Sequence, residues 1–279
     1  MTVPITLSAV LGLVVGSFLN VVIARVPAGR SVVTPSSRCP RCDTPIAARD
    51  NVPVLSWLIL RGRSRCCGSP ISRRYPLVEA GTALALVAVT GWVATRPGAP
   101  DWPLGALPAT SPAGMLAWTA MAYLAVVTIV LALIDIDVRR LPTAIVVPSW
   151  WVGGITLGGA ALLAGNRDAA VRMLVGGLAL WGLYRLLHLV YPAGMGYGDV
   201  RLAGLIGGYL AWLGWAPLLV GAFGGFLLGA VGGALVMLAV GGGRKTTIPY
   251  GPYLLAAAWV GLLWGEPIAR TYLRLTGLA

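Results

Sequence analysis

Long apolar runs separated by short polar segments dominate the chain. We expect eight of these runs to form membrane-spanning helices, at residues 3–22, 77–95, 113–134, 143–165, 169–189, 203–213, 218–240 and 253–264. Most are close to the roughly 20 residues that a helix needs to cross ~30 Å of hydrocarbon. The sixth run is shorter, so it either spans the membrane or re-enters it. The pattern predicts an all-α, polytopic membrane helix bundle of about eight transmembrane helices with a small cytoplasmic insert.

One region is too polar to lie within a bilayer. Residues 26–75 contain prolines, many arginines and all four cysteines of the chain. The region is too short to bury a large core, so we expect a metal ion or the membrane surface to help hold it. The chain is therefore divided into an N-terminal transmembrane helix (1–25), a cytoplasmic cysteine-containing domain (26–75) and a transmembrane bundle (76–279).

Composition and charge agree with a membrane protein. Hydrophobic residues make up 57% of the chain and charged residues only 11%, which is unlike a soluble domain. With the N-terminus outside, 16 of the 21 Lys and Arg residues fall on the cytoplasmic side, as the positive-inside rule requires. This rule accounts for the net charge of +12, and no recognition motif accompanies the charge. We expect membrane lipid, and no nucleic acid, as a partner.

Two carboxylates border apolar runs. Asp135 follows the third run, and Asp199 ends the segment Gly196-Tyr197-Gly198-Asp199, just before the sixth. The two spans between them carry the chain out and back, so both acids are expected at one membrane face. Ionisable groups at such boundaries are functional candidates, and two neighbouring carboxyls can share a proton in acid-base catalysis. Capping of helix ends is the alternative, and position alone leaves both open.

The cysteines predict a different kind of site. Cys39 and Cys42 have the spacing that lets two thiolates bind one tetrahedral zinc ion. The second half is irregular, because Cys66 and Cys67 are adjacent in sequence. If zinc binds, its ligands are expected to be Cys39, Cys42 and Cys67, with Cys66 or a residue other than cysteine as the fourth. A metal-free, packed domain is the alternative.

Several motifs resemble those of the prepilin peptidase family, the membrane aspartic proteases also called type IV prepilin leader peptidases. They are GSFLN, SRCPRC, NVPVLSW, ISRRYPLVE, ID, LP, GYGDVR and IPYGP, which begin at Gly16, Ser37, Asn51, Ile71, Ile134, Leu141, Gly196 and Ile248. The likeness covers nearly the whole chain and keeps the order of the motifs. In the family's pattern the second cysteine pair would fall on Ser64 and Cys67, so Ser64 departs from it.

The resemblance implies an aspartic endopeptidase with Asp135 and Asp199 as the catalytic pair. Such an enzyme removes the short basic leader of type IV prepilins, or of type II secretion pseudopilins, at the cytoplasmic face of the bacterial inner (plasma) membrane. Proteolysis needs no cofactor, whereas N-methylation of the new N-terminus, which many members also carry out, uses S-adenosylmethionine. Structural zinc and retained methyltransferase activity both stay open because of Ser64.

Substrate-binding or supporting roles are expected for a few further residues, namely Gly196, Gly198, Asp137, Glu79 and Arg201. Asp137 is close to Arg139 and Arg140, whose charge favours its ionised form, so it is expected to position the loop or meet the basic leader. The main rival function is a proton- or cation-coupled membrane transporter that uses the same aspartates. A noncatalytic assembly protein of a pilus or secretion machine is a third possibility.

Overall fold

The computed structural model describes residues 2–192, 194–240 and 249–277. The basic loop at 243–246 and Ile248, which begins the last motif, lie outside these residues. Within the described ranges the regular structure is helical, and the only β-type pairings are two isolated bridges, Arg38 with Pro45 and Arg63 with Pro70. The predicted all-α fold is confirmed.

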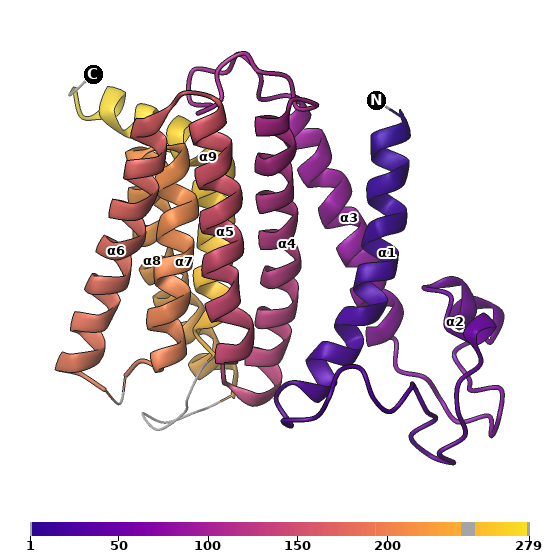
Figure 1. Ribbon diagram of the computed structural model, residues 1–279. Coiled ribbons are helices and arrows are strands. Elements are labelled where there is room, and N and C mark those ends of the chain that lie inside the picture. The colour runs from indigo at the N-terminus through magenta and orange to yellow at the C-terminus, as the bar shows by residue number, and fades with distance from the viewer. Residues whose placement is uncertain (1, 193, 241–248, 278–279) are drawn as a thin grey trace. The chain divides into compact units, whose positions relative to one another are not determined.

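The chain divides into two compact units, Met1–Trp92 and Val93–Ala279. The first contains α1 (Thr2–Arg25), the 3-10 turn η1 (Ala48–Asp50), α2 (Leu55–Ile59) and most of α3 (Arg74–Ala94). The second contains α4 (Pro112–Val138), α5 (Thr143–Leu163), α6 (Arg167–Val190), α7 (Tyr197–Leu213), α8 (Trp215–Val240) and α9 (Gly251–Leu275), as Figure 1 shows.

In the first unit, α1 and α3 approach each other closely. A Cβ atom on Gly12 would lie 2.4 Å from the Cα of Ala83, and one on Gly16 would lie 2.7 Å from the Cα of Glu79. Small residues at these two positions therefore let the helix backbones meet, as is common between membrane helices. Toward the other end of the pair, the hydroxyls of Ser8 and Thr90 are hydrogen-bonded at 2.7 Å.

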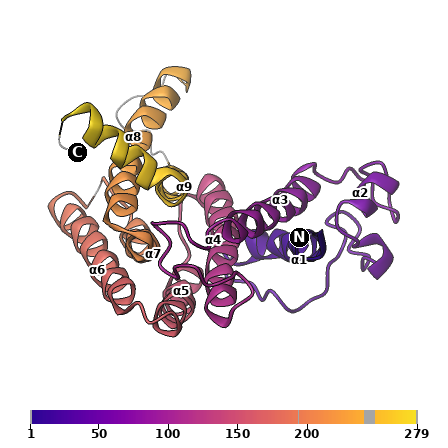
Figure 2. The same ribbon diagram turned by 90° about the horizontal axis from the view of Figure 1, so that it is seen from above.

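In the second unit, α7 is the central helix. Viewed from above, it lies among α5, α6, α8 and α9, and it contacts all four (Figure 2). From Val200 to Leu213 nearly every residue of α7 is buried, including Tyr209 and Trp212. Glycines allow this density: a Cβ on Gly207 would lie 2.6 Å from the carbonyl oxygen of Gly176 on α6. The first turn of α7 carries Asp199, so the helix anchors a candidate acid in the core.

Among the residues that the structure describes, six helices are long and apolar enough to span a membrane, namely α1, α3, α4, α5, α6 and α8. The chain is therefore a multi-pass membrane protein. Two further predicted spans are helical as well: α7, which is 17 residues long, and α9, which continues to Leu275. That these two also cross the membrane stays a prediction. Helix α4 runs four residues beyond the predicted end at Ile134, because no glycine or proline stops it before Arg139 adopts a left-handed conformation.

Candidate functional site

Asp135 lies in the last turn of α4. Its side chain is buried, and Oδ2 accepts a hydrogen bond of 3.0 Å from the backbone N–H of Gly251. Gly251 is the first residue of α9, where backbone N–H groups have no partner within the helix. The start of a helix also carries a partial positive charge, so this position suits a carboxylate.

Asp199 is held in a different way. It is the third residue of α7, its side chain is buried, and its backbone N–H donates at 3.1 Å to the carbonyl of Gly196, the N-cap residue. The carboxyl group lies beside the N-cap, where a Cβ on Gly196 would be 3.1 Å from Oδ2 of Asp199. The arrangement fixes the carboxyl group at the entrance of the helix.

The two acids lie in one neighbourhood, because Leu141 contacts the start of α7, which carries Asp199, and the start of α9, which meets Asp135. Leu141, in the loop between α4 and α5, contacts both helix starts that surround them. A Cβ on Gly198 would lie 2.8 Å from the Cβ of Leu141, and one on Gly251 would lie 2.8 Å from Oδ2 of Asp135. Both positions therefore require glycine, since any side chain would push a neighbour or a candidate acid out of place.

Two tyrosines, Tyr184 buried and Tyr250 half-buried, support the start of α9. The hydroxyls of Tyr184 on α6 and Tyr250, the N-cap of α9, are hydrogen-bonded at 2.9 Å. Room for the Tyr250 ring comes from α8, where a Cβ on Gly229 would lie 2.5 Å from that ring. Tyr250 directly precedes Gly251, so this hydrogen bond helps to position the backbone N–H of Gly251, which donates to Asp135.

The other predicted residues of this unit lie at the edge of the pair. Asp137 is on the same helix as Asp135, but its side chain is exposed. Arg201 is hydrogen-bonded to Thr143 at the start of α5, and its guanidinium lies 4.6 Å from the centre of the Tyr197 ring. Sequence reasoning assigned no role to Leu141, Tyr184 or Gly251, although Gly251-Pro252 at a helix start is a recognisable signal.

In the first unit, all four cysteines come together. Their sulfur atoms lie within 4.8 Å of one another, with Cys39 at 3.6 Å from Cys67 and Cys42 at 3.2 Å from Cys66. A tetrahedral zinc ion with Zn–S bonds of ~2.3 Å needs sulfurs roughly 3.8 Å apart. The cluster therefore fits a metal site, and Cys66 and Cys67 both reach it although they are adjacent.

The cluster is built from two loops with the same backbone pattern. The N–H of Cys39 donates to the carbonyl of Thr44 and its carbonyl accepts from Asp43. In the same way, the N–H of Ser64 donates to Ser69 and its carbonyl accepts from Gly68. Asp43 and Gly68 both have positive φ angles, of 53° and 67°. When the two loops are matched, Ser64 corresponds to Cys39 and Cys66 corresponds to Arg41. The second loop therefore contributes a sulfur from Cys66, at a position where the first loop has an arginine.

The thiols of the cluster are not equivalent. Hydrogen bonds from the backbone of Arg41 and Cys42 lower the pKa of Cys39 to about 5. The Ser64 hydroxyl lowers the pKa of Cys67, whereas a hydrogen bond with Cys42 raises the pKa of Cys66 to about 12. Four thiolates at this distance repel one another, so the fully ionised set needs a cation.

Two family models match the chain. One, described as the bacterial peptidase A24 N-terminal domain, matches residues 10–93, and the other, the type IV leader peptidase family, matches residues 122–234. Proteins described as prepilin leader peptidase/N-methyltransferase are similar over nearly the full length. The protein of Stutzerimonas stutzeri is 38% identical over 96% of this chain and 93% of its own, and that of Aeromonas hydrophila 39% over 94% and 91%.

This chain belongs to the type IV leader peptidase family. A more distant relative, from Xanthomonas campestris, is 32% identical over 97% of this chain and 95% of its own. No solved structure matches the chain. The family model of the peptidase includes Asp135 and Asp199, while the N-terminal model includes the cysteine cluster and Glu79.

Proposed function

We propose that this chain is a prepilin leader peptidase that also methylates the new N-terminus, with Asp135 and Asp199 as its catalytic pair. One observation carries the assignment of the pair: two carboxyl groups, 64 positions apart in the sequence, are both buried at helix ends that are joined through Leu141 and Gly251. Family membership and the full-length relatives support the reaction. The substrates are prepilins or pseudopilins, cleaved at the cytoplasmic face.

The pair suits water-mediated peptide hydrolysis. Two neighbouring buried carboxyls cannot both ionise at low cost, so together they hold one proton. The ionised acid accepts a proton from water as the water oxygen attacks the scissile carbonyl, and the protonated acid donates to the substrate. When the C–N bond breaks, the leaving amine takes up a proton from the pair, and no covalent intermediate with the enzyme forms.

The surrounding backbone sets the geometry of this reaction. Asp135 is restrained by the Gly251 N–H, and the carboxyl group of Asp199 lies close against Gly196. Both acids lie at helix ends, where a peptide segment outside the hydrocarbon can reach them. A transporter would instead use ionisable groups along a path through the spans, so the position of the acids favours hydrolysis over the rival function.

The cysteine cluster is proposed to bind one structural zinc ion through Cys39, Cys42, Cys66 and Cys67. Its role would be to hold the two loops of the insert together, because four sulfur ligands leave no open position for a reacting group. Proteolysis does not require this ion. The low pKa of Cys39 supports the assignment, since a thiolate is the form that binds the metal.

The first prediction tests the pair directly. Purified chain in lipid nanodiscs is incubated with a prepilin, and leader removal is followed by mass spectrometry. Asp135→Asn and Asp199→Asn each remove one proton acceptor while keeping the shape, so cleavage should fall by at least about 10²–10⁴-fold. Asp168→Asn, an exposed acid in the first turn of α6, is the matched control and should cleave normally. Normal cleavage by either variant of the pair would refute the assignment.

A further inference from the structure

The first unit contains a cavity that neither peptide hydrolysis nor the cysteine cluster uses. Its volume is about 410 Å³, and it lies between the second half of α1 and the segments 32–37 and 51–53. Apolar side chains from α1 and from the facing loop form one part of the wall, among them Val14, Phe18 and Val33. Polar groups form another part: Arg25, three serine hydroxyls and the amide of Asn51.

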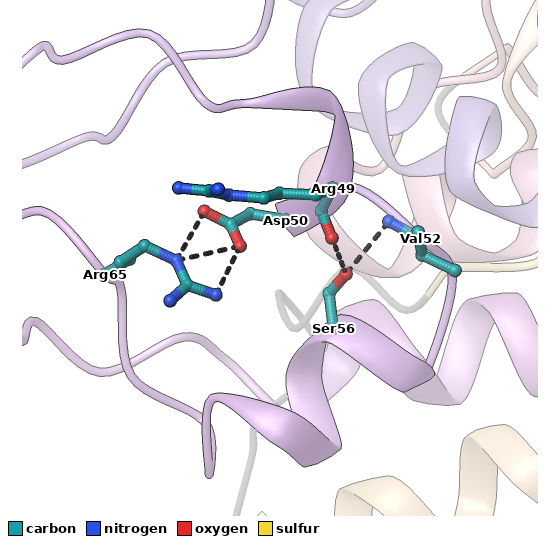
Figure 3. A network of polar contacts seen from close by, with 5 residues as sticks. All are labelled: Arg49, Asp50, Val52, Ser56 and Arg65. Carbon is teal, nitrogen blue, oxygen red and sulfur yellow. Dashed lines mark hydrogen bonds and ion pairs between the residues drawn. The ribbon is translucent and has the colours of Figure 1, made fainter.

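The wall at 51–53 is held in place from several sides. The hydroxyl of Ser56 accepts the N–H of Val52 at 2.9 Å and donates to the carbonyl of Arg49 at 3.1 Å, as Figure 3 shows. Beside it, Asp50 accepts three hydrogen bonds of 2.8–3.0 Å from Arg65 (Figure 3). These bonds connect the wall to α2 on one side and to the second cysteine loop on the other.

The residue that follows segment 51–53 in the sequence has a strained backbone. Val54 has φ = 60° and ψ = −49°, a conformation that β-branched residues rarely adopt. Its N–H donates at 2.7 Å to Oε2 of Glu79, a buried carboxylate on α3. Strained backbone persists where the surroundings fix it, and it is common at ligand sites. The predicted supporting role of Glu79 is thus assigned here to the loop that borders the cavity.

We propose that this cavity binds S-adenosylmethionine, an assignment that rests on the methyltransferase half of the proposed function. The volume lies within the ~300–1,000 Å³ of small-molecule sites. Arg25, with one N–H group on the carbonyl of Ser31, has further donors that can bind the carboxylate of the methionine part. The apolar wall suits the adenine ring, and the hydroxyls and Asn51 suit the ribose.

The chemistry that the cofactor supplies is an electrophilic methyl group: its C–S bond breaks as a C–N bond to the neutral N-terminal amine forms, the amine releases a proton, and S-adenosylhomocysteine remains. A lipid acyl chain is the main competing occupant. The polar side chains within the wall, Ser36, Ser37 and Asn51, disfavour it, because a hydrocarbon chain would cover them without offering a hydrogen bond.

Binding of radiolabelled S-adenosylmethionine to the purified chain in nanodiscs tests the proposal. Arg25→Gln should weaken binding about tenfold to 100-fold, since hydrogen bonds between charged groups are the strong ones. Arg30→Gln, an exposed arginine of the loop that follows α1, does not line the cavity; it is the matched control and should bind normally. Thermal unfolding of each variant checks that the chain is folded.

Photo-crosslinking locates the label without relying on any variant. The expected result is labelling of peptides that contain residues 14–37 or 51–53. Labelling only of peptides from α4 to α9, equal binding by the parent chain and Arg25→Gln, or competition by phosphatidylglycerol but not by S-adenosylhomocysteine would each overturn the proposal. Leader removal is measured on the same samples: cleavage without cofactor binding refutes only the cavity assignment, whereas loss of cleavage by the parent chain refutes the proposed function.

Discussion

The carboxyl pair and the cysteine cluster are positioned by different means. Asp135 and Asp199 depend on the packing of a helix bundle, and the N–H that meets Asp135 comes from a residue 116 positions away. The cysteines depend on two short loops, each closed by its own backbone hydrogen bonds. A site of the first kind should be sensitive to changes in packing, and a site of the second kind mainly to changes of its ligands.

Apart from the loss of a carboxyl group of the pair, the largest effect is expected at the cluster, from Cys66→Ser. If Cys66 is the fourth ligand, this change should weaken zinc binding more than about 100-fold, because the metal is held by only four ligands. The double variant Ser64→Cys, Cys66→Ser moves the sulfur to the place that matches Cys39 and should restore binding. Metal content after dialysis against a competing chelator measures both. Stoichiometric zinc in the single variant would show that Cys66 is not a ligand.

An intermediate effect is expected from Gly251→Ala at the pair. The added Cβ would lie 2.8 Å from Oδ2 of Asp135, so the carboxyl group must move. A displacement of ~1 Å at a catalytic group can lower a rate by about 100-fold, and we expect a loss of cleavage of that size. Gly182→Ala on α6, where a Cβ meets open space, is the control and should keep full activity. Equal rates for the two variants would contradict the dependence on packing.

The smallest effect is expected from Asp137→Asn. This acid is exposed on the last turn of α4, where solvent and salt screen its charge, so cleavage should fall by less than about tenfold. The rate should depend on ionic strength in the parent more than in the variant. If Asp137→Asn were inactive while Asp135→Asn remained active, the pair would have to be Asp137 with Asp199.

Much of the bundle could be predicted from the sequence, because runs of about 20 apolar residues leave few alternatives to a helix. The sequence also predicts that Asp135 and Asp199 lie at the same face of the membrane, because two predicted spans separate them. The start of α7 was harder to place: Asp199 and Arg201 interrupt the apolar pattern, so the predicted run began at Ala203 although the helix begins at Tyr197. Charged residues are compatible with the first turn of a helix, but they interrupt the apolar pattern from which the start of the helix is predicted.

Contacts between distant segments could not be predicted in the same way. Nothing near Gly251 in the sequence indicates Asp135, since their meeting depends on how α9 packs in the bundle. The fourth sulfur was also left open, because adjacent cysteines do not usually reach one metal ion. Only the matching backbone of the two loops places Cys66 beside Cys42.

The two matched loops also bear on how such sites can evolve and be found. Their hydrogen bonds involve backbone atoms, so the loop closes in the same way whether its first ligand position holds Cys39 or Ser64. A cysteine can therefore move along the loop by single substitutions without a change of fold. Searches that require two Cys-x-x-Cys pairs would overlook this chain, whereas a search for the loop itself, with its positive φ residue and closing carbonyls, would detect it.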